Sequence, residues 1–346
     1  MYINYVNDQN KNVYVSSWLL LITFLLIVMI LVGGLTRLTD SGLSITNWDL
    51  FSGILPPINK SDWENYFSLY KKIPEYKLLN SSMTIEEFKV IFWWEYAHRL
   101  LGRLIGITFL IPLIYFTWKK IISKKYLIFL YLIFFLILFQ GFMGWYMVKS
   151  GLTVRTDVSH YRLSTHLTIA FIILILTFWN FLNYNNKSIN FKIKKIPYNL
   201  PLVFLSLIII QISIGALVSG LDAAQVYQTW PLMNDFYFPD DSNFKDLFAA
   251  NVLSIPSLVQ FLHRNIAYFI YIFFLFVLYF ILREKKFNYF KNISVIIFIF
   301  LNFQMLLGIV TIISENKIIY ASMHQAGSIF LTLSALILVF KNSKTN

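Results

Sequence analysis

The chain has 346 residues, of which 58% are hydrophobic and only 13% charged, whereas soluble proteins have about 45–50% apolar and about 25% charged residues. This composition excludes an ordinary water-soluble domain and favours an integral membrane protein. The net charge of +12 does not indicate nucleic-acid binding, because Lys and Arg lie in short tracts between apolar runs, as in the cytoplasmic loops of membrane proteins. The absence of cysteine excludes disulfides and thiolate metal sites.

The polar N-terminus, Met1 to Tyr14, precedes an apolar run without a cleavage site, which predicts an uncleaved first span. About 20 apolar residues are needed to cross a bilayer core of about 30 Å, and eight runs of this kind occur. They lie near Val15 to Leu35, Tyr96 to Trp118, Tyr126 to Val148, Leu163 to Leu182, Leu200 to Ser219, Phe261 to Leu282, Ile293 to Ile313 and Tyr320 to Phe340. We therefore expect an all-α integral membrane protein with eight transmembrane helices.

Basic residues follow the second, fourth and sixth spans, in the segments Lys119 to Lys125, Lys187 to Lys195 and Arg283 to Lys291. By the positive-inside rule these short loops are cytoplasmic. We therefore expect both termini on the cytoplasmic side of the cell inner membrane. The two longest loops, Thr36 to Trp94 and Gly220 to Gln260, then form caps on the outer side.

The two halves of the chain share residue spacings. Gly33, Asp40 and Trp48 have the same separations as Gly215, Asp222 and Trp230, and Gln140 and Gly144 match Gln304 and Gly308. Each half has four spans and would keep its orientation, which is typical of a parallel duplication. The pattern predicts two repeat-related four-helix bundles, residues 1–190 and 191–346.

Four of the five histidines occupy matching places near the start of the even-numbered spans: His98, His166, His263 and His324. Each is followed four residues later, on the same helix face, by a small side chain against which a flat macrocycle can lie; these are Gly102, Ala170, Ala267 and Ser328. Two histidines per half suit the axial positions of one heme better than a zinc site, which needs three or four ligands. His160 has no counterpart, and we expect it in a loop without a function.

The halves differ three residues before the first histidine, where one has Glu95 and the other Gln260. Glu95 would share a helix face with His98, and a carboxylate beside a heme can move protons or stabilise positive charge. This asymmetry assigns the chemistry to the N-terminal half; the alternative role for Glu95 is an ion pair with Arg99 or Arg103. Arg99 and Arg264, among other arginines near the outer ends, are candidates for binding heme propionates.

Seven segments carry a family resemblance. They are GGLTRLTDSGLSITNW at Gly33 to Trp48, EYAHRLLGR at Glu95 to Arg103, QGFMGWYMVKSGL at Gln140 to Leu152, VSHYRLSTHL at Val158 to Leu167, GALVSGLDAAQVYQTWPLM at Gly215 to Met233, QFLHRNIAY at Gln260 to Tyr268 and ASMHQAG at Ala321 to Gly327. In these segments, and over nearly its whole length, the chain resembles the heme A synthase family. Because it has no cysteine, the chain resembles the proteobacterial and mitochondrial branch of the family. It departs from many members at Gln228 to Pro231, where they have Asn-Thr-Phe-Pro.

The resemblance implies oxidation of the C8 methyl of heme O to the formyl group of heme A, for use in cytochrome oxidase. It implies that His98 and His166 are ligands around the substrate heme, that Glu95 is the catalytic carboxylate, and that His263 and His324 are axial ligands of a heme b cofactor. The implied partners are a heme O synthase, the cytochrome oxidase assembly machinery and an unidentified electron donor, with a homo-oligomer as a further expectation.

Two other functions fit the same residues. A diheme cytochrome with two histidine ligands per heme would transfer electrons only, and Glu95 and the resemblance argue against it. A transporter would suit the parallel repeat, but the spans lack broken-helix signals other than Pro112.

Overall fold

The structure is a computed structural model that describes residues 13–47, 52–154, 156–185 and 193–345. Eight of its helices are long and apolar enough to cross a membrane. They are α1 (Val13–Leu38), α4 (Ile85–Trp118), α5 (Lys124–Val154), α6 (His160–Asn185), α7 (Leu200–Gly220), α8 (Pro256–Arg283), α9 (Asn288–Ile313) and α10 (Ile318–Ser343). The described residues form no β-strand, so the predicted all-α class and the eight spans are confirmed.

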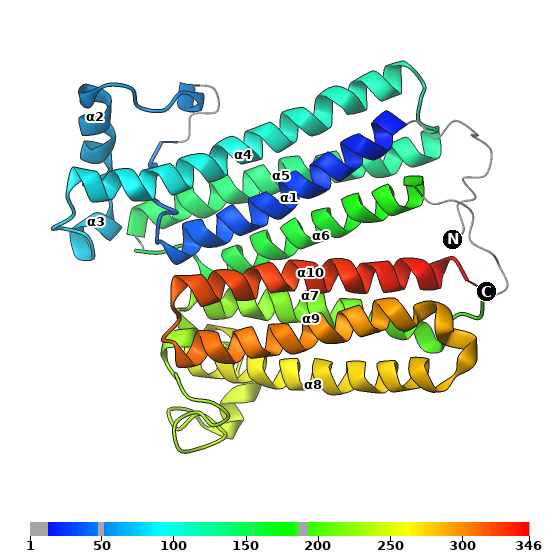
Figure 1. Cartoon of the computed structure of the whole chain (residues 1–346). Helices are drawn as coiled ribbons and strands as arrows, with labels where there is room; N and C mark the ends of the chain where they lie inside the picture. Colours follow the sequence, from blue (N-terminus) through cyan, green and yellow to red (C-terminus); the bar gives the residue numbers. More distant parts are fainter. Residues whose placement is uncertain (1–12, 48–51, 155, 186–192, 346) are drawn as a thin grey trace.

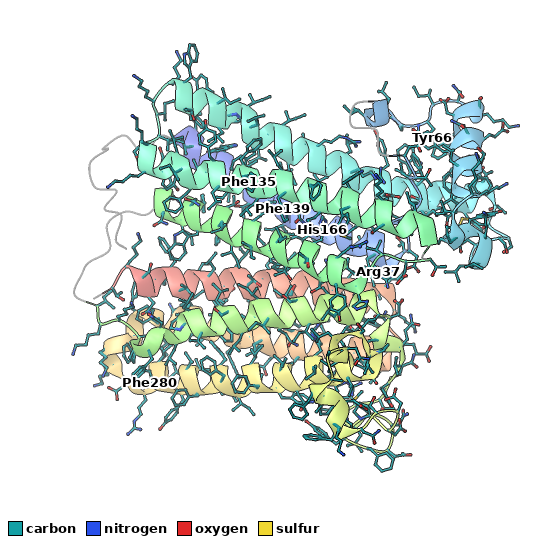
Figure 2. All side chains as sticks on the ribbon, turned by 180° about the vertical axis from the view of Figure 1, so that it is seen from behind. Arg37, Tyr66, Phe135, Phe139, His166 and Phe280 are labelled. Atoms are coloured by element: carbon teal, nitrogen blue, oxygen red, sulfur yellow. The ribbon has the colours of Figure 1, made fainter. Side chains whose placement is uncertain are left out.

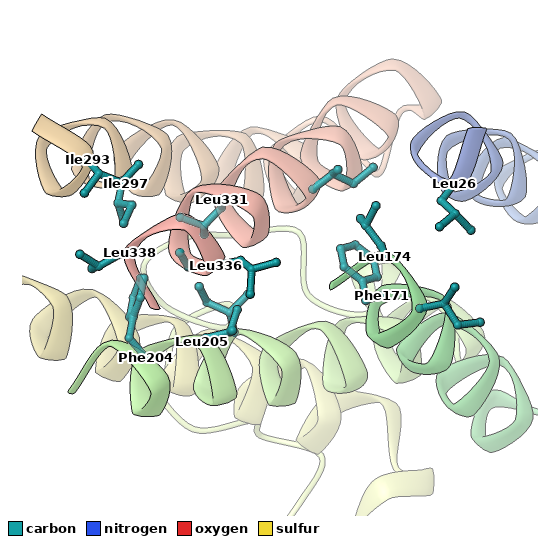
Figure 3. Close-up of a cluster of buried hydrophobic side chains, with 14 of the residues drawn as sticks. Leu26, Phe171, Leu174, Phe204, Leu205, Ile293, Ile297, Leu331, Leu336 and Leu338 are labelled. Atoms are coloured by element: carbon teal, nitrogen blue, oxygen red, sulfur yellow. The ribbon is translucent and has the colours of Figure 1, made fainter. Parts of the chain in front are cut away.

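The spanning helices form two groups of four that lie side by side, α1, α4, α5 and α6 in one and α7 to α10 in the other (Figure 1). The groups meet along α1, α6, α7 and α10. A single buried apolar core runs through both groups; Figure 3 shows a part of it, with Phe171 and Leu174 on α6, Phe204 on α7 and Leu331 on α10. The arrangement is compatible with two repeat-related bundles, although they share one core.

The predicted boundary at residues 190 and 191 lies outside the described residues, as do Trp48 and Lys187.

The short helices gather at one end of the bundle, called the capped end below, while α1 begins and α10 ends at the other end (Figure 1). They are η1 (Ser52–Ile54), α2 (Lys60–Tyr70), α3 (Pro74–Leu78), η3 (Ala223–Gln225), η4 (Phe244–Phe248) and η5 (Val252–Ser254). Phe67 and Tyr70 of α2 pack on Phe88 and Phe92 of α4 in a separate apolar cluster. At the opposite end, η2 (Pro197–Asn199) and η6 (Lys285–Phe287) precede α7 and α9.

The helix α4 begins at Ile85, well before the predicted start at Tyr96. A capping box starts it: the Thr84 hydroxyl accepts a hydrogen bond from the Glu87 backbone N–H, and the Glu87 carboxylate accepts one from Thr84. Hydropathy locates the apolar part of a helix and not its first residue, so α4 extends beyond the apolar run. His98 consequently lies several turns inside α4 and does not open it.

Candidate functional site

One cavity of about 1800 Å³ runs between the helices and reaches the capped end. Every site residue predicted from the sequence lines it: Glu95, His98, Arg99, His166, His263, Arg264 and His324. The four small residues one turn after the histidines line it as well. Figure 2 labels His166 on α6 and Arg37 near the end of α1. Sequence reasoning thus found residues that the fold brings together from four helices.

A glycine of a neighbouring helix lies against each of the four imidazoles. A β-carbon built on Gly33 would lie 2.9 Å from Cε1 of His98, and one on Gly215 would lie 3.0 Å from Cε1 of His263. The corresponding distances are 3.1 Å between Gly308 and His324 and 3.4 Å between Gly144 and His166. His98, His263 and His324 therefore occupy space that only a glycine leaves, whereas the contact at Gly144 is an ordinary one. Sequence analysis used these glycines as markers of the repeat and missed this role.

Three glutamines hold the backbone at the histidines. The side-chain amide of Gln140 donates to the carbonyl of His166 (2.8 Å), that of Gln211 to the carbonyl of His263 (2.9 Å) and that of Gln304 to the carbonyl of His324 (2.9 Å). These bonds join adjacent helices and fix the position of each histidine along its helix relative to the neighbouring helix. The role of Gln211 was missed, because its repeat-related position in α1 is Met29, so the repeat gave no signal.

Glu95 is buried, with 2% of its surface exposed, and its carboxylate is fully hydrogen-bonded. Oε1 accepts from two nitrogens of Arg99, at 3.0 and 2.6 Å, and Oε2 accepts from the Ser44 hydroxyl and the Ile45 backbone N–H, both at 2.7 Å. Arg99 also donates to the carbonyls of Ile45 and Asn47. The ion pair considered as an alternative is therefore present, and it fixes the carboxylate beside the cavity.

The matching network in the C-terminal half lacks the carboxylate. The Gln260 amide donates to the carbonyl of Tyr227 (2.9 Å), and Arg264 donates to the carbonyls of Tyr227, Thr229 and Leu232. Arg99 and Arg264 thus each donate hydrogen bonds to backbone carbonyls of a loop at the capped end. The negative charge of Glu95 is the main chemical difference between the two networks.

The donor set fits two hemes. Each of the four imidazoles lines the cavity, but its Nδ1 is buried and has no hydrogen-bond partner among the described residues, so Nε2 is the ring nitrogen left for a ligand in the cavity. His166 lies close enough to His98, and His263 to His324, for a charge on one imidazole to affect the other, so the histidines are grouped in pairs within each half. Within the described part of the chain, no three His, Asp or Glu side chains gather as a zinc site requires. The cavity exceeds the roughly 300–1,000 Å³ of a single ligand pocket.

Two carboxyls at the capped end complete the mouth of the cavity. Burial raises the pKa of Glu75 to about 7, while the hydrogen bond from the Tyr70 hydroxyl (2.9 Å) opposes this shift. Asp40 also lines the cavity, and its side chain is exposed. Arg37 binds Asp40 and Asp222, each at 2.7 Å, and so connects the two halves across the mouth.

The expectation that His160 lies in a loop is wrong, because His160 is the first residue of α6. It is buried, with 9% of its surface exposed, and its Nε2 lies 3.2 Å from the Ser254 hydroxyl. Its backbone packs against Gly220 at the end of α7. His160 therefore contributes to the contact between the halves.

The fold and the cavity define a multi-pass helical membrane protein with four histidines, two from each half, along one internal cavity. The family model of COX15-CtaA, described as cytochrome oxidase assembly protein, matches residues 16–336. The chain belongs to this family.

Relatives named heme A synthase are similar over almost their full length. The one from Pelagibacter ubique (strain HTCC1062) is 48% identical to this chain over 98% of the chain and 99% of the relative. Relatives with the same name from Sinorhizobium fredii (strain NBRC 101917 / NGR234) and Rhizobium etli (strain ATCC 51251 / DSM 11541 / JCM 21823 / NBRC 15573 / CFN 42) are 39% and 40% identical. The matches cover 93% and 94% of the chain and 88% and 89% of these relatives.

Proposed function

We propose that the chain is a heme A synthase, an oxidoreductase that converts the C8 methyl of heme O to the formyl group of heme A for cytochrome oxidase assembly. The observation that carries this proposal is the presence of four histidines along one cavity, two from each half, together with the buried Glu95 carboxylate near His98 where the other half has Gln260 near His263. The relatives that bear this name support it.

In this proposal the N-terminal half, residues 1–190, binds the substrate. His98 and His166 hold heme O between α4 and α6, and the glycines beneath them set the position of each imidazole. Oxidising a methyl group to a formyl group removes four electrons from one carbon, which an external oxidant must accept, and adds one oxygen atom. Positive charge would develop at the heme edge where electrons leave before protons. The Glu95 carboxylate, fixed by Arg99, Ser44 and Ile45, stabilises that charge without having to reorganise.

The C-terminal half, residues 191–346, holds a heme b cofactor in this proposal. His263 and His324 would be its axial ligands, and the bound group would supply electron transfer to or from the substrate site. Arg264, which lines the cavity, would bind a propionate. Arg99 would serve the same purpose in the other half. The neutral Gln260 leaves this pocket without the charge that Glu95 supplies.

We further propose an inner-membrane location with both termini cytoplasmic, on the basis of the basic loops after the second, fourth and sixth spans. Heme O then arrives from a heme O synthase in the same membrane, and an electron donor and a homo-oligomer belong to the same proposal.

The heme content of the purified protein tests the proposal. Protein from cells that make heme O should contain heme b together with heme O or heme A, whereas heme b alone would indicate the diheme cytochrome and overturn the synthase. His263→Ala and His324→Ala should remove the heme b absorbance. The matched control His98→Ala should keep it, and its loss there would overturn the assignment of the two halves.

A further inference from the structure

The cavity is not symmetric between the two halves. In the N-terminal half it continues between α4 and α5, where six residues line it: Gly106, Ile107, Leu110, Phe134, Leu138 and Phe142. The repeat relates these six, by the spacings of His98 to His263 and Gln140 to Gln304, to Tyr271, Ile272, Leu275, Phe298, Asn302 and Leu306. None of the six counterparts in the C-terminal half, all of them described residues, lines the cavity. The extension, called the α4–α5 groove below, therefore exists in one half only.

Two substitutions between the halves account for the difference. Tyr271 of α8 donates its hydroxyl hydrogen to Oδ1 of Asn302 on α9, at 2.9 Å, and this bond closes the space between the two helices. The matching residues in the N-terminal half are Gly106 and Leu138, which have neither a ring nor a hydrogen-bonding group. A β-carbon built on Gly106 meets no atom within 4 Å, so the groove is open where Tyr271 fills its counterpart.

The groove leads from the histidines into the apolar part of the bundle. Gly106 lies two turns beyond His98 on α4, about 12 Å along the helix axis at 1.5 Å per residue. The groove lining carries no charged or polar side chain, and Ile107, Leu138 and Phe142 are more than half exposed on the outer surface of the bundle. A ligand that extends from the histidines into this groove must therefore be long, flexible and apolar.

We propose that the α4–α5 groove holds the isoprenoid tail of the substrate heme, and that its closure by Tyr271 and Asn302 restricts the other half to a heme without such a tail. The inference rests on the proposed function. Heme O differs from heme b by a hydroxyethylfarnesyl chain in place of a vinyl group, so the two halves differ in the same respect as the two hemes.

The groove selects by shape. An isoprenoid tail in a lipid bilayer is already removed from water, so moving it into the groove brings little hydrophobic free energy. Closing the groove, in contrast, would force the tail against packed side chains, and such overpacking weakens binding. Gly106 and Leu138 are thus specificity-determining residues for the tail and are not needed to bind the macrocycle.

The test gives the groove of the N-terminal half the two residue types that close the matching space in the C-terminal half. The double variant G106Y/L138N should bind heme O at least about tenfold more weakly than the unchanged protein while its affinity for heme b in the N-terminal half changes little; tenfold corresponds to about 1.4 kcal/mol. The measurement is an absorbance titration of purified protein, already loaded with heme b in the C-terminal half, with heme O or with heme b. The variant I111Y is the matched control, because Ile111 is 63% exposed on α4 and does not line the cavity.

The reverse variant, Y271G/N302L, should allow the C-terminal half to take up heme O. Unchanged heme O affinity in G106Y/L138N would overturn the proposal and would leave an ordinary lipid chain as the occupant of the groove. An equal loss of heme O and heme b would also overturn it, because the tail would then not be what the groove distinguishes. Failure of the proposed function would look different, since the unchanged protein would then not bind heme O at all.

Discussion

The glycines beneath the imidazoles make heme binding sensitive to a single methyl group. In Gly215→Ala the new β-carbon lies 3.0 Å from Cε1 of His263, inside the optimal separation of about 3.5–4.0 Å between carbon atoms. The imidazole must then shift by several tenths of an ångström, and overpacking of this kind costs roughly 1–3 kcal/mol. We expect heme b to bind about 5- to 140-fold more weakly, at 1.4 kcal/mol for each factor of ten.

The assay is a titration of purified heme-free protein with heme b, followed by the absorbance of the bis-histidine complex. Gly141→Ala on α5 is the control, since its β-carbon meets no atom within 4 Å. Unchanged heme affinity in Gly215→Ala, or an equal loss in Gly141→Ala, would refute the reasoning.

Three further predictions concern charge and orientation. Glu95→Gln should lower heme A formation by about 10² or more, the usual scale for losing electrostatic or acid–base assistance, and Gln260→Glu should create no activity; near-normal heme A output from Glu95→Gln would reduce Glu95 to a structural partner of Arg99. Burial raises the pKa of Glu75 to about 7, so the free energy of unfolding should fall by up to about 3 kcal/mol as the pH rises from about 4.5 to 7, because the carboxyl of the unfolded chain releases its proton first. Thermal melting of Glu75→Gln should lack this pH dependence, and an unchanged dependence would refute the prediction. A reporter fused between Lys119 and Lys125 should indicate the cytoplasm and one near Ser242 the outer side, and the opposite result would reverse the topology.

The sequence predicted the spans and picked out residues that the fold brings to one cavity, because both depend on strong local or periodic signals. Apolar runs of about 20 residues have few structural solutions apart from membrane helices. The four histidines were recognisable because the repeat places them at matching positions, and the structure brings all of them to one cavity. The Glu95–Arg99 pair was foreseen as an alternative, since residues four apart share a helix face.

The features that were missed depend on contacts between distant segments. The start of α4 at Ile85 follows from a capping box outside the apolar run, to which hydropathy is blind. His160 lacks a repeat partner, so nothing in the sequence pointed to its contact with Ser254. The contact between Gly33 and His98 joins α1 to α4 across a long loop, and the α4–α5 groove arises from what Gly106 lacks. Such features appear only when the helices are packed.

The conversion of heme O to heme A tests the central claim most directly. Membranes that contain this chain, supplied with heme O and analysed for extracted hemes, should accumulate heme A, and membranes with His98→Ala should not. Persistence of heme O without any heme A, in protein that carries both of its hemes, would contradict the account and would leave a membrane cytochrome.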